Sequence, residues 1–144
     1  MKIIVNEGQA ELVITIDCPL YTPQISQMVA ELRSFGQKLS GTKDGQTHLI
    51  ERQDVFYVES VDKRCFIYTE ADVYETSQKL YQFEECQGDL HFFRSSKSQV
   101  VNIMKISSLC PDFGGRIEIV MENGEKLVVS RQFARTLKER LGVK

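Results

Sequence analysis

The first 44 residues carry the pattern of one strand followed by one helix. Apolar and polar residues alternate over residues 10–16, as in a strand with one buried face, and Asp-Cys-Pro at residues 17–19 ends the run. A helix is predicted to begin at Pro23, with Thr22 as its N-cap, and to end before Gly41. Its apolar residues form one stripe: Ile25, Met28, Val29, Leu32, Phe35 and Leu39. This stripe either packs on the chain's own sheet or forms a dimer seam.

After residue 44 the pattern changes to short apolar runs separated by turns. Asp44-Gly45 is a typical hairpin turn, so we place a boundary there, between an amino-terminal element of residues 1–44 and a domain of residues 45–144. Strands are expected at residues 55–58, 65–68, 100–103, 117–121 and 126–129. Asn123-Gly124 can supply the two positive-φ positions of a type I′ turn, which predicts a hairpin over residues 117–129.

Two short helices are expected to interrupt the strands. One begins at residue 76 or 77 and ends at residue 85, which buries Leu80 and Phe83. The other lies between Ser130 and Gly142, and its apolar positions fall on one face: Phe133, Leu137 and Leu141. Most of the chain after residue 44 is therefore expected to form strands.

Composition indicates a folded, soluble chain. With 144 residues, 42% of them hydrophobic and 26% charged, the protein has room for one ordinary domain and a small appendage. Acidic residues at positions 7 and 11 do not fit a signal peptide, and the chain has no apolar run long enough to span a membrane. The four cysteines, none in a C-x-x-C pair, favour reduced thiols. These features predict a cytoplasmic protein.

Charge is distributed unevenly along the chain. Residues 45–90 hold four basic and ten acidic residues, whereas residues 91–144 hold ten basic and five acidic residues, a local net charge of +5. The formal net charge of −2 therefore hides a basic segment that one face could present to a polyanion. The alternative is a solvated charge distribution without a ligand.

Sequence patterns of catalysis are missing. The chain contains neither a Gly-rich phosphate loop nor a G-x-S-x-G or H-E-x-x-H motif. Asp112-Phe113-Gly114 matches the metal-binding tripeptide of kinases, but the chain is too short for a kinase and lacks its other motifs, so we interpret it as a loop. His48 and His91 have no ligand at metal-site spacing. We expect no enzymatic activity, no cofactor and no metal.

Two ordered motifs change this picture. Residues 91–102 read His-Phe-Phe-Arg-Ser-Ser-Lys-Ser-Gln-Val-Val-Asn, and residues 103–109 continue as a strand. Gly-Arg-Ile-Glu at residues 115–118 leads through Asn-Gly-Glu to Val-Val-Ser-Arg-Gln-Phe, which ends at residue 133. Upstream, residues 54–60 read Asp-Val-Phe-Tyr-Val-Glu-Ser. In this order and spacing, these segments resemble the LytTR-type DNA-binding domain of bacteria over about residues 45–141.

The resemblance implies a mainly β fold of antiparallel strands in layers, with short helices, preceded here by the strand-helix element. It also implies a non-catalytic transcription regulator whose loops enter the major grooves of double-stranded DNA. Residues 1–44 are too short for the phosphorylated receiver domain of many members, so the chain looks like the receiver-less type. Relatives of that type often have a small integral-membrane protein as regulatory partner.

Carried over residue by residue, the resemblance implies base-reading positions in three loops. The first loop contributes Lys63 or Arg64, the second contributes Lys97 with Ser98, and the third contributes Arg131. Arginine can bond bidentately to guanine O6 and N7, lysine can contact the same atoms or a phosphate, and serine can donate to a phosphate oxygen.

Arg94 and Lys105 are further candidates for phosphate contacts. Arg94 follows two phenylalanines directly, so the alternative for it is a structural bond to a carboxylate. For the loop cations, the alternative is that they are solvated surface charges.

We expect the protein to bind repeated half-sites as a homodimer, to which the amino-terminal element contributes or on which it only packs. The alternative function is a non-catalytic protein-interaction module that keeps the fold, does not bind DNA, and uses strand edges and the acidic segment of residues 45–90 as its surface.

Overall fold

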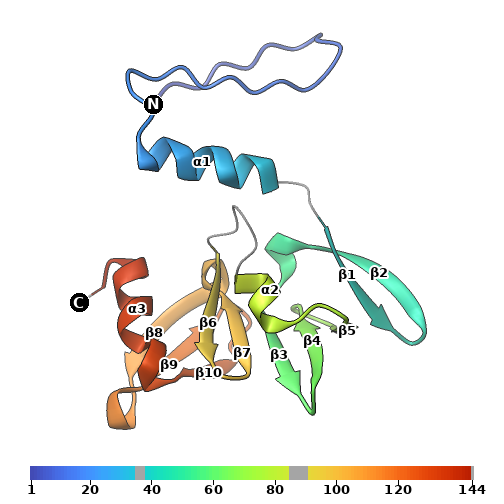
Figure 1. The fold of residues 1–144 in the computed structure, drawn as a ribbon, viewed down its shortest axis with the longest axis vertical. Coiled ribbons are helices and arrows are strands. Elements are labelled where there is room, and N and C mark those ends of the chain that lie inside the picture. Colours follow the sequence, from blue (N-terminus) through green and yellow to red (C-terminus); the bar gives the residue numbers. More distant parts are fainter. Residues whose placement is uncertain (35–37, 85–90, 144) are drawn as a thin grey trace.

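A computed structural model gives the fold of residues 1–34, 38–84 and 91–143 (Figure 1). Within these ranges the helices are α1 (Pro23–Ser34), α2 (Leu80–Glu84) and α3 (Arg131–Leu141), together with the 3-10 turns η1 (Arg52–Asp54), η2 (Ile103–Lys105) and η3 (Phe113–Gly115). The strands are β1 (Lys38–Lys43), β2 (Gln46–Glu51), β3 (Tyr57–Val61), β4 (Arg64–Tyr68), β5 (Val73–Thr76), β6 (Phe92–Ser96), β7 (Gln99–Asn102), β8 (Ile106–Pro111), β9 (Ile117–Met121) and β10 (Lys126–Val129). No helix in the described ranges is long and apolar enough to cross a membrane.

The strands form two antiparallel sheets. The larger sheet has the order β2-β1-β5-β4-β3-β7-β6, and the smaller has the order β10-β9-β8. Both sheets contribute side chains to one apolar cluster, which α3 also joins through Ala134 and Leu137. The predicted fold class, mainly β with layered antiparallel strands and short helices, is confirmed.

Strands β3, β6 and β7 bury side chains on both faces of the larger sheet. Neighbouring residues on each strand, such as Val100 and Val101, belong to different clusters. The first cluster, on the side of α2, contains Leu39, Ile50, Val55, Val58, Cys65, Ile67, Leu80, Phe83, Phe92 and Val100. The second, between the sheets and α3, contains Phe56, Tyr57, Phe93, Val101, Ile117, Ile119, Met121, Val129, Ala134 and Leu137. Burial on both faces explains why each of these strands has two consecutive apolar residues: Tyr57-Val58, Phe92-Phe93 and Val100-Val101.

Asn102, the last residue of β7, joins three backbone segments from inside the core. It is 2% exposed. Its side-chain Nδ2 donates to the Val55 carbonyl at 2.9 Å, and its Oδ1 accepts from the Met104 N–H at 3.0 Å, which caps η2. Its backbone N–H donates to the Phe56 carbonyl at 2.9 Å. A buried amide with both ends bonded fixes where β3 begins relative to β7.

The hairpin over residues 117–129 forms as predicted, but its turn is of a different type. Gly124 has a φ of 86°, whereas Asn123 is not in the positive-φ region. The Gly124 N–H donates to the Met121 carbonyl, and the Met121 N–H donates to the Glu125 carbonyl, both at 2.8 Å. This is the three-residue loop that ends in a bulge. The Asn123 side chain stabilises it by accepting from the Glu125 N–H at 3.0 Å.

Helix α3 and the two predicted buried residues of α2 agree with the sequence. Helix α3 ends at Gly142, whose φ of 70° forms a left-handed C-cap. Helix α2 buries Leu80 and Phe83 but begins later than predicted, because Thr76 pairs with Cys65 in the sheet and its Oγ1 accepts from the Gln78 N–H. The predicted end of that helix at residue 85 lies outside the described residues.

The amino-terminal element differs most from its prediction. Thr22 caps α1 as expected, with its Oγ1 accepting from the Ile25 N–H at 3.3 Å. The strand expected at residues 10–16 is absent, because no other segment of the described chain pairs with it. Leu39 is not on the helix stripe but is buried in β1, where it pairs with Ile50. Phe35, also placed on that stripe, lies outside the described residues.

Asp44-Gly45 forms the predicted hairpin turn, with positive φ at both positions. The turn joins β1 to β2, and β1 also pairs with β5 through Thr42 and Glu75. The boundary that we drew after residue 44 therefore falls inside a hairpin of the larger sheet.

Asn102→Ala should lower the free energy of unfolding by about 1–3 kcal/mol, because the Val55 carbonyl and the Met104 N–H would lose buried partners. Urea denaturation of the full chain measures this change. Asn123→Ala is the matched control, since it removes one exposed side-chain bond to a backbone N–H. A loss for Asn102→Ala no larger than that for Asn123→Ala would contradict the role of Asn102.

Candidate nucleic-acid interface

The three loops predicted to read DNA lie at one end of the larger sheet. Strands β3 and β7 are antiparallel, so the end of β3 meets the start of β7. There the Ser60 N–H donates to the Ser98 carbonyl at 2.8 Å. The Ser130 N–H, just before α3, donates to the Ser95 carbonyl at 2.9 Å. These two backbone bonds join the end of β3 to the β6–β7 turn and the end of β6 to the start of α3. The arrowheads of β3 and β6 point the same way in Figure 1, so the three loops follow at the same end of the sheet.

The β6–β7 turn presents Lys97 and Ser98 to solvent on a fixed backbone. Both residues are exposed, and the register of β6 against β7 shifts between Arg94 and Ser96. Beneath the turn, Ser95 is fully buried and its Oγ donates to the Gln99 carbonyl at 3.1 Å. The Ser98 N–H donates to the Ser96 Oγ at 3.2 Å. The Lys97 ammonium has no partner among the residues that the structure describes.

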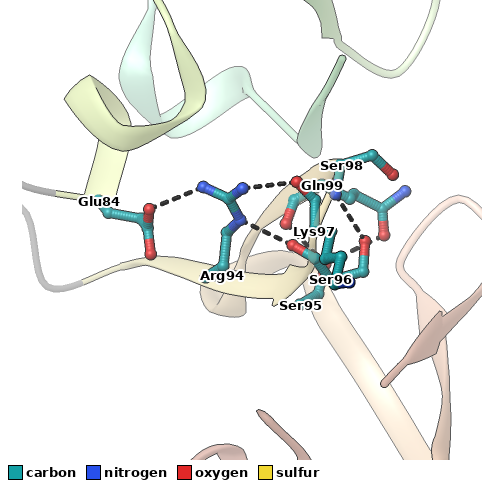
Figure 2. Close-up of polar contacts among 7 residues, drawn as sticks. All are labelled: Glu84, Arg94, Ser95, Ser96, Lys97, Ser98 and Gln99. Carbon is teal, nitrogen blue, oxygen red and sulfur yellow. Dashed lines mark hydrogen bonds and ion pairs between the residues drawn. The ribbon is translucent and has the colours of Figure 1, made fainter. Parts of the chain in front are cut away.

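Arg94 holds this turn from within the chain (Figure 2). Its Nε donates to the Ser96 carbonyl at 2.7 Å and its Nη2 to the Lys97 carbonyl at 2.5 Å. Its Nη1 donates to the Glu84 carboxylate on α2 at 2.8 Å, and the Arg94 side chain is 22% exposed. Because all three guanidinium nitrogens already have acceptors, this geometry favours a structural role for Arg94, with a bond to a carboxylate, over a phosphate contact.

The β3–β4 turn contributes Lys63. Asp62 and Lys63 have φ values of 52° and 66°, which is the two-residue type I′ geometry. Lys63 is exposed, and no other described residue bonds its ammonium. Arg64 is committed to a neighbour, because its guanidinium donates to both oxygens of Glu75 at 2.8 Å and lies 5.6 Å from the ring centre of Phe66.

Arg131 is the first residue of α3 and is exposed, without a bonded partner in the part of the chain that the structure describes. Its aliphatic stem packs on Gly115, where an added Cβ would lie 3.3 Å from the Arg131 Cγ. The sequence did not reveal this support from η3, although the glycine belongs to one of the recognised motifs. Gly115 has a φ of 82°, so both its conformation and its missing side chain suit the contact.

Lys105 does not lie at the end of the larger sheet that carries the three loops. It lies in η2, after the far end of β7, where its Nζ is 3.7 Å from a Glu122 oxygen and 5.3 Å from the ring centre of Phe56. The geometry thus groups Lys63, Lys97 and Arg131, and separates Lys105 from them. Among the described residues, no three His, Cys, Asp or Glu side chains gather as a metal site requires.

Comparison with known proteins gives concordant results. The model of the LytTr DNA-binding domain matches residues 45–142. An uncharacterised HTH-type transcriptional regulator of Staphylococcus aureus strain MRSA252 is 26% identical over 145 aligned positions, which cover 99% of this chain and 98% of that protein. Its counterpart in strain NCTC 8325 / PS 47 is 25% identical with the same coverage.

Among solved structures, the chain is similar to the LytTr DNA-binding domain of a DNA response regulator from Bacillus cereus. The TM-score is 0.69 at 24% identity, and the match covers 74% of this chain and 97% of that domain. This likeness supports the layered fold. With the family match over residues 45–142, it follows that the chain belongs to the LytTr DNA-binding domain family.

Proposed function

We propose that the protein is a non-catalytic, cytoplasmic transcription regulator that binds double-stranded DNA in a sequence-specific manner and reads the major groove through loops. The observation that carries this proposal is the pair of backbone hydrogen bonds by which the ends of β3 and β6 bind the β6–β7 turn and the start of α3, so that three loops lie at one end of the sheet. Each of these loops presents a cation without a described partner. The family match supports DNA binding, and the names of the S. aureus relatives, HTH-type transcriptional regulators, support transcription regulation.

The described fold favours loops over a helix-turn-helix as the elements that contact DNA. A helix-turn-helix needs two consecutive helices, and within the described residues α1, α2 and α3 are separated from one another by strands. Arg131 suits a bidentate contact to guanine, and Lys97 with Ser98 suits a base edge or phosphate beside it. Lys63 is the corresponding cation of the first loop, whereas Arg64 would have to release Glu75 before it could bind DNA.

In this proposal neither Arg94 nor Lys105 contacts DNA together with the three loops. Arg94 positions the backbone of Lys97, so its effect on DNA would be indirect. Lys105 lies away from the three loops and serves as a comparison for them. The protein is further proposed to bind repeated half-sites as a homodimer, with half-site centres separated by whole helical turns of about 10–10.5 bp.

The proposed function is tested by selecting bound fragments from random double-stranded DNA with the full chain, followed by titration of the enriched sequence and a scrambled one. We expect enrichment of a repeated motif and an affinity at least about a thousandfold higher than for scrambled DNA at physiological salt. Failure to enrich any sequence, even at low salt, would favour the protein-interaction alternative.

Arg131→Ala should weaken binding to the selected DNA by about 1–3 kcal/mol and relax the preference at one base pair, because the guanidinium fork would be lost. Arg131→Lys should keep most of the non-specific affinity but lose selectivity, since an ammonium is not a planar fork. Paired titrations on selected and scrambled DNA measure both effects. Equal losses on the two DNAs would make Arg131 a phosphate contact instead.

Gly115→Ala should weaken specific binding because the added methyl group would displace the Arg131 stem, whose Cγ is 3.3 Å away. Gly114→Ala is a close control: Gly114 has a φ of 73° and nothing within 4 Å of an added Cβ. Both variants carry a left-handed alanine, which costs about 1–2 kcal/mol of stability. The two variants should therefore have similar melting temperatures, but Gly115→Ala should bind the selected DNA more weakly than Gly114→Ala. Indistinguishable affinities would argue against support of Arg131 by Gly115.

Lys97→Ala should reduce affinity and, where Lys97 touches phosphate, make the slope of log K against log salt less steep by about 0.9. Lys105→Ala changes the net charge equally but lies at the other end of β7, so its affinity and slope should stay close to those of the unmodified protein. Titrations over a range of salt concentrations compare the two. The proposed interface is wrong if Lys105→Ala has the larger effect.

A further inference from the structure

Residues 1–33 carry much apolar surface and bury none of it fully. Leu12, Val13 and Ile14 are 88%, 67% and 59% exposed, and Met28 and Leu32 on α1 are 37% and 38% exposed. Single exposed apolar residues are ordinary, but a contiguous group of this kind marks an interaction surface. The described part of the chain leaves this surface exposed.

A groove of about 430 Å³ runs between α1 and the segment before it. Leu12, Ile14 and Ile16 line it from the segment, and α1 contributes Ile25, Val29 and Leu32. The segment therefore turns its even-numbered side chains toward α1, as the alternation over residues 10–16 would give in a strand. Its backbone has no ladder partner among the described residues.

We infer that a second copy of this chain supplies the missing partner. Residues 10–16 of the two copies pair as antiparallel strands around a twofold axis, and both α1 helices cover the same face of the resulting ribbon. This inference rests on the proposed homodimer but is independent of DNA binding. It names the surface that makes the dimer and the residues at its centre.

A twofold ribbon allows only a few registers. In an antiparallel pair, opposite residues point to the same face, so both copies place Leu12, Ile14 and Ile16 toward the helices only when even residues lie opposite even ones. Three such registers are centred near the middle of the segment, on Leu12, Val13 or Ile14.

Charge and the length of the segment select among these three registers. Centring on Ile14 places Glu11 opposite Asp17 of the partner strand, and centring on Leu12 places Ile16 opposite Gly8, which has a φ of 85° and lies outside the segment. Like charges directly opposite each other destabilise a strand pair. Centring on Val13 places Leu12 opposite Ile14 and Glu11 opposite Thr15, so no like charges oppose. The segment is thus complementary to itself in one register, which favours a second copy over an unrelated partner.

Disulfide cross-linking tests this register in the full chain with Cys18, Cys86 and Cys110 replaced by serine. In Val13→Cys the two Cα atoms would lie about 4.5–5.5 Å apart, within disulfide range, so oxidation should give covalent dimers at low protein concentration. In Thr15→Cys the two positions are offset by four residues, or roughly 13 Å, and should not cross-link. Cross-linking of Thr15→Cys but not of Val13→Cys would overturn the register.

The dimer itself is tested without DNA by sedimentation equilibrium of the full chain. Ile14→Asp would place charged groups in the ribbon and should raise the dimer dissociation constant by at least about tenfold. Leu49→Asp is the matched control, since Leu49 on β2 is 69% exposed and outside the segment. Unchanged circular dichroism would show that both variants fold. A monomeric full chain, or equal effects of the two substitutions, would overturn the inference and leave DNA binding to be judged separately.

Discussion

Burial of β3, β6 and β7 on both faces is the constraint on which the rest of the structure depends. Each of these strands gives neighbouring side chains to two different cores, so a shift by one residue would exchange the contents of both. Asn102 adds a buried hydrogen-bond requirement at one end of β7. The opposite end carries the turn with Lys97. The register that protects the cores therefore also sets the position of that turn.

The candidate interface inherits its rigidity from this arrangement. The β6–β7 turn is held by Arg94, by buried Ser95 and by the bond from Ser60 at the end of β3, and Ser130 binds β6 just before the turn. Arg131 stands at the junction of β10 with α3, whose Leu137 is fully buried in the second core. A cation on such a base loses only its own side-chain freedom when it binds, which lowers the entropic cost of recognition.

The sequence predicted the elements whose burial is simple and missed those that depend on distant partners. Short apolar runs predicted β3, β4, β7, β9 and β10, because each of these strands places apolar side chains in a core. Strand β1, with the sequence Lys-Leu-Ser-Gly-Thr-Lys, has one long apolar residue and forms by pairing with β2 and β5. Conversely, residues 10–16 have the pattern of a strand but no ladder. For the site, motifs predicted the loops, whereas the commitment of Arg94 to Glu84 and the remote place of Lys105 follow from tertiary contacts.

The distribution of acidic partners explains how a chain with a net charge of −2 keeps a basic end. Acidic residues of the segment 45–90 pair with particular cations: Glu75 with Arg64 and Glu84 with Arg94. These pairs neutralise cations that hold the fold. At the three loops, by contrast, Lys63, Lys97 and Arg131 have no described carboxylate to bind and are exposed to solvent. Acidic residues of the segment 45–90 thus neutralise cations with a structural role and leave the cations of the three loops charged and exposed.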